Sequence, residues 1–207
     1  AACGGGGGGG LSGCLSSGDP FASRPADAAR ALVYYISTVE IMQTYPVMLK
    51  LRSRPVLVVG AGAVARRKVR GLLRAGADVT VLAQRVEDEA DLAGARVVRH
   101  HYRPEYVRGM ALVFACTDDS NLNARIADDA RAAGAWVNAV DQPDACDFYA
   151  VAVVRDGPVQ IAVGTGGAAP ALAGWLKGRI AEAIPPRLGA FAEALRDMRT
   201  RLQREEH

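Results

Sequence analysis

Residues 55–65 constrain the fold of this chain more than any other segment, because a short apolar stretch runs directly into a glycine-rich turn and an amphipathic helix. Gly60-x-Gly62-x-x-Ala65 matches the dinucleotide-binding pattern. In that pattern the first glycine permits a tight turn, the second lets a pyrophosphate approach the backbone, and the third small residue lets helix and strand pack closely. The strand before it and the helix after it are the context that this pattern requires. The segment therefore predicts a turn that binds a dinucleotide.

The same alternation of apolar runs and amphipathic stretches continues along the chain. Predicted strands lie at 55–59, 78–83, 95–99, 111–116 and 135–140, and the clearest helices lie at 63–75 and 121–133. Strands that are almost wholly apolar and alternate with helices are typical of a parallel sheet covered on both faces. The sequence therefore predicts an α/β fold, a doubly wound Rossmann sheet. The connection that holds Pro104 is expected to be irregular.

After Asp141 the pattern changes. Phe148–Arg155 and Val159–Gly164 flank the turn residues 156–158 and predict a two-stranded hairpin. One helix is predicted after Pro170 and another is predicted to carry the apolar residues between Leu188 and Leu202. A hairpin with two helices is too small to be stable alone. It must pack on the Rossmann unit or on a second copy, and we expect a homodimer.

These patterns divide the chain into three parts. Residues 1–41 begin with a run of glycines and continue with small and polar residues, a composition that cannot bury a core. They are expected to be a disordered low-complexity tail or an extension foreign to the native protein, which would then start at Met42. Residues 42–146 are the predicted Rossmann domain, and residues 147–207 are the predicted hairpin-and-helix dimerisation region.

Composition excludes several classes of function. The net charge is only +3 and the few aromatic residues do not interleave with the basic clusters, which argues against nucleic-acid binding. No stretch reaches the roughly 20 apolar residues of a membrane span, and no secretory signal is present at the start of the sequence. Four cysteines without a C-x-x-C pair indicate free thiols in a reducing compartment, so we expect a cytoplasmic protein. Metal-ligand spacing is missing too, and no metal site is expected.

Charged residues beside the glycine turn bear on the cofactor. Arg66, Arg67 and Lys68 crowd the first turns of the predicted helix, where positive charge opposes the helix dipole unless a pyrophosphate is bound there. The acidic residue that would hold the ribose hydroxyls is missing after the second strand. Gln84 could bond those hydroxyls, whereas Arg85 could accept a 2′-phosphate. The residues alone therefore leave NAD and NADP open.

A second set of candidates follows the fourth and fifth predicted strands. Thr117-Asp118-Asp119 and Asn138-Ala-Val-Asp141 lie where ligands gather, beyond the carboxyl ends of parallel strands. Asp118 and Asp119 also have an ordinary interpretation as caps of the next helix. No helical pattern begins after Asp141, so it is the candidate catalytic carboxylate.

These segments, in this order, resemble a known family. The matching runs are Val59–Lys68, Cys116–Asp119, Asn121–Asn123, Val137–Asp141, Asp144–Tyr149, Gly157–Pro158 and Thr165–Ala173. Together they are similar to the siroheme-synthase N-terminal family, the precorrin-2 dehydrogenases. The resemblance extends from about Tyr45 to Leu202. The Arg-Lys pair after the glycine turn and the Thr-Gly-Gly segment are more specific than the glycine pattern alone.

The resemblance implies a function and a set of site residues. It implies NAD-dependent oxidation of precorrin-2 to sirohydrochlorin by a homodimer that exchanges its hairpin and helices, with Asp141 as the general base. The implied cofactor contacts are Gly60, Gly62, Ala63, Val64, Gln84, Arg85 and Thr117, and the implied contacts of the tetrapyrrole substrate are Arg66, Lys68, Asn138, Thr165, Gly166 and Gly167.

Some members of that family also insert ferrous iron, which would make Fe²⁺ a second substrate. This chain departs from the usual pattern at Ala169, where members often have serine, and at Val151, where they often have proline. The resemblance therefore leaves iron insertion open, as well as the choice between siroheme and cobalamin synthesis. The methyltransferase domain of longer members is not expected here.

Two other functions are compatible with the glycine turn. A Rossmann sensor without catalytic activity, such as a regulatory subunit of an ion transporter, would need the turn but neither Asp141 nor the Thr-Gly-Gly segment. An NADP-dependent reductase of another small metabolite would use Arg85 for the 2′-phosphate.

Overall fold

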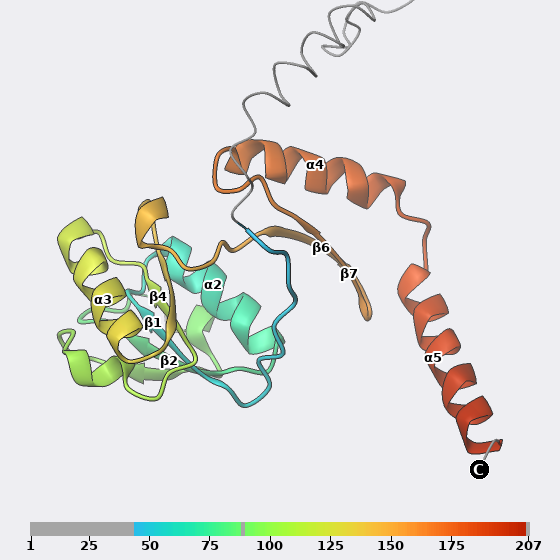
Figure 1. The fold of residues 1–207 in the computed structure, drawn as a ribbon, viewed down its shortest axis with the longest axis horizontal. Helices are drawn as coiled ribbons and strands as arrows, with labels where there is room; N and C mark the ends of the chain where they lie inside the picture. The colour runs from blue at the N-terminus through green and yellow to red at the C-terminus, as the bar shows by residue number, and fades with distance from the viewer. Residues whose placement is uncertain (1–43, 88–89, 206–207) are drawn as a thin grey trace, which may run out of the picture. The chain divides into compact units, whose positions relative to one another are not determined.

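The computed structural model describes residues 44–87 and 90–205 (Figure 1). The predictions for residues 1–41 lie outside this part of the chain. Within it, the strands β1 (Pro55–Val59), β2 (Asp78–Leu82), β3 (Arg96–Val98), β4 (Leu112–Ala115) and β5 (Trp136–Ala139) form one sheet. All neighbouring pairs are parallel and the strand order is β3-β2-β1-β4-β5. The predicted doubly wound Rossmann sheet is confirmed.

Alternating side chains of the strands explain why helices cover both faces of this sheet. On β1, Val56 and Val58 belong to the apolar cluster that includes α2 (Ala63–Arg74), whereas Leu57 and Val59 belong to the cluster that includes α3 (Ser120–Ala132). Each helix contributes one buried stripe: Ala65, Val69 and Leu72 on α2, and Asn123, Ile126, Ala127 and Ala130 on α3. Full burial of one such aliphatic side chain contributes about 1.5–3 kcal/mol.

Short 3-10 turns make three of the connections. They are η1 (Ala90–Leu92), η2 (Pro104–Val107) and η3 (Pro143–Ala145). The irregular connection predicted around Pro104 contains η2, which begins at that proline and buries Val107. Next to it the hydroxyl of Tyr102 donates to Oδ2 of Asp129 on α3 at 2.9 Å. This bond helps to hold the connection against the helix.

The C-terminal region contains the predicted hairpin and the two predicted helices. The strands β6 (Ala152–Asp156) and β7 (Val159–Val163) are antiparallel, and they precede α4 (Pro170–Ala183) and α5 (Leu188–Glu205). The prediction that the first hairpin strand begins at Phe148 is wrong by four residues. The carbonyl of Phe148 accepts a hydrogen bond from Asn138 on β5, so this part of the chain is bonded to the Rossmann sheet instead of to β7.

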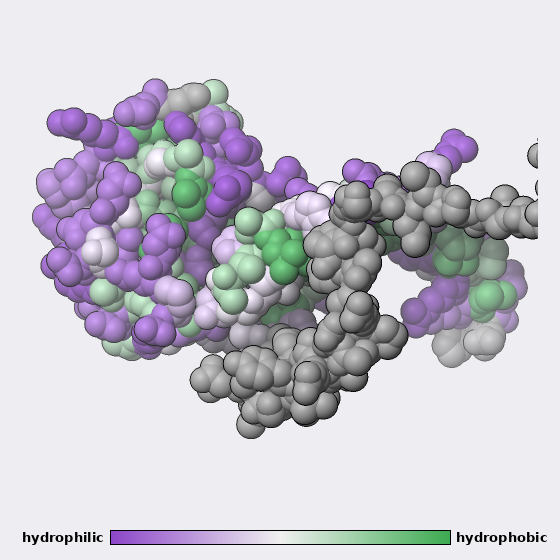
Figure 2. All heavy atoms as spheres, turned by 90° about the horizontal axis from the view of Figure 1, so that it is seen from above, coloured by the Kyte–Doolittle hydropathy of each residue, from purple (hydrophilic) through white to green (hydrophobic). Residues whose placement is uncertain are grey.

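Large apolar side chains are exposed on both C-terminal helices. They are Leu172 and Trp175 on α4, and Phe191, Leu195, Met198 and Leu202 on α5. Those of α5 are spaced four, three and four residues apart, which places them on one face of the helix. Hydrophobic residues are visible at the surface in the region of α5 (Figure 2). No helix within residues 44–87 and 90–205 has the length and apolar character needed to cross a membrane.

Candidate functional site

The two glycines of the turn after β1 have different structural environments. Gly60 has a φ of +109°, and a Cβ atom there would collide with the carbonyl oxygen of Cys116 at the end of β4. Gly62 has an ordinary extended conformation, and a Cβ atom there would meet nothing within 4 Å. Gly60 is therefore required by the close approach of two backbones, whereas the hydrogen at Gly62 leaves open space beside the turn.

The first turn of α2 is suited to bind an anion. Gly62 is its N-cap residue and no side chain caps the helix, whose first turn also lacks an acidic residue. Unpaired N–H groups at a helix N-terminus, together with the helix dipole, favour a phosphate. Ala63 is exposed and Val64 is half-buried in this turn, so their small side chains leave the backbone accessible. The geometry fits the pyrophosphate of a dinucleotide.

Gln84 and Arg85 lie just beyond the carboxyl end of β2, and both are exposed. The N–H of Gly60 donates to the carbonyl of Leu82 at 2.8 Å, which places the glycine turn beside the end of this strand. In Rossmann folds the ribose of the cofactor is bound at this position. The structure thus puts both predicted ribose contacts next to the predicted pyrophosphate site.

Arg66 is engaged by a residue that sequence inspection missed. Its Nε lies 3.6 Å from Oδ2 of Asp91 on η1, and Nη1 of Arg70 lies 2.8 Å from Oδ1 of the same carboxylate. These pairs are partly exposed, so each contributes little to stability. Asp91 is 25 residues away in the chain and belongs to no motif, and only the fold reveals the contact. Arg66 is therefore oriented toward η1.

Lys68 and Asn138, both predicted to bind substrate, are bonded to each other. Nζ of Lys68 donates to Oδ1 of Asn138 at 2.8 Å and lies 4.9 Å from the centre of the Phe114 ring. Burial is the main reason that the pKa of the Lys68 amine lies below its ordinary value. This contact joins α2, which begins at the glycine turn, to β5, which leads to Asp141.

The loop after β4 is held by Asn123, a buried residue on α3. Oδ1 of Asn123 accepts from Oγ1 of Thr117 at 2.7 Å and from the N–H of Thr117 at 3.1 Å, and its Nδ2 donates to the carbonyl of Thr117 at 2.9 Å. Thr117 thus faces the helix with its polar groups paired. An asparagine on the apolar stripe of a predicted helix was the available signal for this role.

Asp119 is confirmed as a helix cap. Its Oδ1 accepts from the N–H of Asn121 at 2.9 Å and from the N–H of Leu122 at 3.1 Å, at the start of α3. Asp118 beside it is exposed.

Asp141 is two residues beyond β5, in the turn that leaves the sheet. It is exposed and has a φ of +58°, which is uncommon for a residue other than glycine. Its neighbour Gln142 donates from Nε2 to the carbonyl of Ser120 at 2.7 Å, which ties the turn to the start of α3. The candidate base is therefore at the carboxyl edge of the sheet, on the same edge as the glycine turn.

The Thr165-Gly166-Gly167 segment lies at the start of α4. Oγ1 of Thr165 accepts from the N–H of Ala169 at 3.3 Å, and both glycines have positive φ. A Cβ atom at Gly167 would come within 3.2 Å of the ring of Tyr149, so the segment packs on that ring. Tyr149 follows Phe148, whose carbonyl is bonded to Asn138. The segment is thus linked to the end of β5 through these two neighbouring residues.

Comparison with known proteins agrees with this arrangement. Residues 47–152, half of the chain, match the family described as "Putative NAD(P)-binding". The chain belongs to this NAD(P)-binding family. Residues 156–183, which hold most of the hairpin and α4, match the family described as "Sirohaem biosynthesis protein central". The resemblance inferred from the sequence motifs is confirmed.

Curated relatives are named siroheme synthases. The chain is 43% identical over 166 residues to the siroheme synthase of Methylococcus capsulatus, covering 78% of this chain and 35% of that protein. It is 42% identical over 164 residues to that of Methylobacillus flagellatus, covering 75% of this chain and 35% of that protein. The chain therefore spans about a third of the length of these relatives.

A solved structure is similar over most of both chains. It is titled SirC, precorrin-2 dehydrogenase, and matches with a TM-score of 0.64 and 27% identity over 76% of this chain and 79% of that one. Because the match extends well past residue 152, the C-terminal region contributes to the likeness as well as the Rossmann sheet.

Proposed function

We propose that this chain is an NAD-dependent dehydrogenase that oxidises precorrin-2 to sirohydrochlorin in siroheme synthesis. The observation that carries the proposal is the position of Asp141. It lies at the same carboxyl edge of the sheet as the uncapped N-terminus of α2, in a chain whose fold resembles that of SirC, precorrin-2 dehydrogenase. A dinucleotide held at the glycine turn and a substrate beside Asp141 would meet at this edge.

The chemistry assigns one task to each part of the site. NAD, when bound, supplies the acceptor for a hydride that leaves the macrocycle. The N–H groups at the start of α2 bind the pyrophosphate, and Gln84 bonds the ribose hydroxyls. The carboxylate of Asp141 takes the proton that leaves with the hydride, so that the substrate loses two electrons and two hydrogens. Lys68 and Asn138 fix the distance between the cofactor helix and the strand that leads to this base.

The decisive experiment is an anaerobic assay with precorrin-2 and NAD, in which the absorbance change to sirohydrochlorin is followed. Asp141→Ala is expected to lower kcat by about 10²–10⁴-fold, because a general base contributes that much. Asp118→Ala is the matched control, since it removes an exposed carboxylate from the loop after β4. Wild-type turnover by Asp141→Ala would refute the role of the base. NAD binding without any turnover by the wild type would instead favour the sensor.

The cofactor preference is tested in the same assay. Gln84 supports NAD, and Arg85 is the feature that would support NADP. We expect kcat/KM to be higher with NAD, and a reversal would favour an NADP-dependent enzyme. Addition of ferrous ion to the cuvette then measures whether Fe²⁺ is a second substrate. Within the described residues no group of three or more His, Cys, Asp or Glu side chains is arranged to hold a metal ion.

We also propose a homodimer in the cytoplasm. The dimer is supported by the apolar face of α5, whose side chains would lose contact with water against a second copy. The compartment is supported by Cys116 and Cys146, which are both free thiols.

A further inference from the structure

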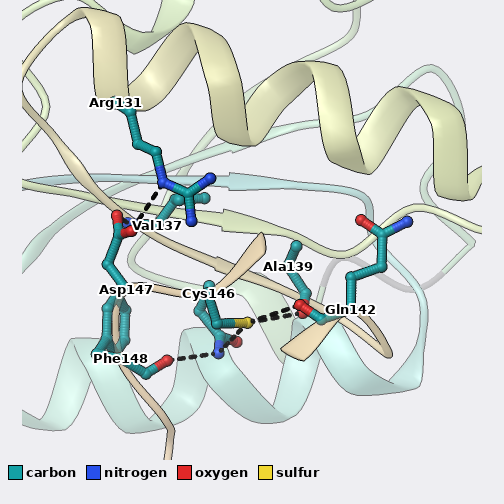
Figure 3. A network of polar contacts seen from close by, with 8 residues as sticks. Arg131, Val137, Ala139, Gln142, Cys146, Asp147 and Phe148 are labelled. Atoms are coloured by element: carbon teal, nitrogen blue, oxygen red, sulfur yellow. Dashed lines mark hydrogen bonds and ion pairs between the residues drawn. The ribbon is translucent and has the colours of Figure 1, made fainter. Parts of the chain in front are cut away.

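The turn that carries Asp141 is closed at its base by Asp147 (Figure 3). The N–H of Asp147 donates to the carbonyl of Val137 at 2.8 Å, and Oδ2 of Asp147 accepts from the N–H of Val137 at 2.9 Å. Nε of Arg131 donates to the other carboxylate oxygen at 2.8 Å. The chain thus leaves β5, makes its turn through η3, and returns to the same strand, so that residues 140–146 form a closed loop.

The thiol of Cys146 lies inside this loop. Its Sγ is 3.1 Å from the carbonyl oxygen of Ala139 and 3.3 Å from that of Gln142, and Nδ2 of Asn138 donates to the sulfur at 3.4 Å (Figure 3). The two carbonyls are on either side of Asp141, one before it and one after it. The single S–H proton is shared between them. Among the described contacts, the thiol is therefore the group that joins the two ends of the turn around the base.

Asp141 needs such a restraint because its φ of +58° is in the left-handed region. A residue with a side chain stays in this conformation only when its surroundings hold it there. Gln142 supplies one restraint through its bond to Ser120, and the Cys146 thiol supplies the restraint from inside the loop.

We propose that Cys146 is a positioning residue, whose S–H group holds the Asp141 carboxylate where it takes the proton from the substrate. This proposal rests on the proposed role of Asp141 as the base. Cys146 itself touches neither the substrate nor the cofactor. It acts through the backbone of the turn, and its loss leaves the base present but misplaced.

The environment of the thiol suits this role. Burial is the main reason that the pKa of Cys146 lies above its ordinary value, so the sulfur keeps its proton at neutral pH. A protonated sulfur donates to the carbonyls, whereas a thiolate would place a negative charge against two carbonyl oxygens. Lys68 is bonded to the same Asn138 whose amide faces the sulfur, which continues the network into α2.

The test compares Cys146→Ala and Cys146→Ser with the wild type in the precorrin-2 assay. Cys146→Ala is expected to lower kcat by about tenfold, because small displacements of a catalytic group have effects of this size. The KM for NAD is expected to change little, since the glycine turn is untouched. Cys146→Ser retains a donor and is expected to recover part of the lost kcat. Equal kcat for Cys146→Ala and the wild type would overturn the proposal.

Tyr102→Phe is the control for a purely structural effect. It also removes one hydrogen bond, to Asp129, from the same apolar cluster against which Cys146 packs. It is expected to lower the melting temperature and leave kcat unchanged. If Cys146→Ala does not fold, Cys146→Val replaces it, because valine fills the space of the thiol without a donor.

A double variant separates this proposal from the proposed function. In an Asp141→Ala background, Cys146→Ala should have no further effect on the residual rate, because the group that it positions is gone. A tenfold loss in both backgrounds would show that Cys146 acts independently of Asp141, which overturns the positioning role. If Asp141→Ala turns over at the wild-type rate, the proposed function fails instead. If Asp141→Ala is slow but Cys146→Ala is not, the positioning role alone fails.

Discussion

At the scale of single residues, the glycine turn separates two requirements that a sequence motif presents as one. Gly60 is fixed by the neighbouring backbone of Cys116, and it would be required even if no ligand were bound. Gly62 has free space around it, and its lack of a side chain matters only to a molecule that enters that space. The pattern of glycines predicts the ligand, but the distinction between the two roles depends on β4, which lies more than 50 residues later in the chain.

Alanine substitutions at the two glycines should therefore have opposite effects. Gly60→Ala is expected to lower the free energy of unfolding by about 3 kcal/mol, because the new Cβ collides with a backbone oxygen in a strained conformation. Gly62→Ala should change it by less than about 1 kcal/mol, the usual cost at an N-cap. The affinity of Gly62→Ala for NAD should nevertheless fall by at least about tenfold, because the methyl group keeps the pyrophosphate from the backbone. Urea unfolding and NAD titration check both, and equal stability losses would contradict the assignment.

Cys116 predicts a dependence of stability on pH. Burial raises the pKa of this thiol to about 11 in the folded chain, while the unfolded chain loses the same proton near 9.0. Above the lower value the unfolded state binds fewer protons, so the free energy of unfolding falls as the pH rises from 9 to about 11 and is unaffected below. The fall is on the order of 2–3 kcal/mol. Urea unfolding of the wild type and Cys116→Ala at several pH values measures it. A constant difference between the two proteins would contradict this explanation.

At the scale of elements, α3 shows how one side chain sets the start of a helix. Asp119 bonds two N–H groups that would otherwise have no partner in the helix. Asp119→Ala is expected to lower the free energy of unfolding by about 1 kcal/mol. Asp118→Ala is the control, since its exposed carboxylate is not the cap, and it should have little effect. Similar losses in the two variants, measured by thermal or urea unfolding, would count against the cap.

The strands and helices were largely predictable, because each is a run of buried apolar residues or a stripe at helical spacing. Their ends were less so. The hairpin strand starts at Ala152 because Phe148 is bonded to Asn138, a contact that no local pattern reveals. The candidate site divides in the same way. Gly60, Gly62 and Asp141 follow from position relative to strands, whereas Asp91, Asn123 and Cys146 act through partners that only the fold brings near.

At the scale of the whole molecule, the C-terminal helices leave much apolar surface in water. Phe191 and Met198 on α5 are 61% and 59% exposed. Side chains of this size contribute about 1.5–3 kcal/mol each when they are buried, which makes association of two copies favourable.

Charged substitutions on this face should separate the copies. Phe191→Asp and Met198→Asp are each expected to shift the protein from dimer to monomer, because a carboxylate would then have to lose water in the interface. Glu193→Gln, two residues from Phe191 and on the other side of the helix, is the matched control and should stay dimeric. Light scattering after size-exclusion chromatography measures the mass. A wild type that is monomeric at every concentration would contradict the dimer.

The collision that Gly60 avoids also has a consequence for the newly made polypeptide. The nucleotide turn lies against the carbonyl of Cys116, and β1 pairs with β4 across more than 50 residues of intervening chain. Contacts so far apart in sequence form late, because the loop between them must first be closed. A ribosome that has released β1, α2 and β2 has therefore made every residue of the glycine pattern without yet making a cofactor site. Competence to bind the dinucleotide arises only when β4 takes its place beside β1.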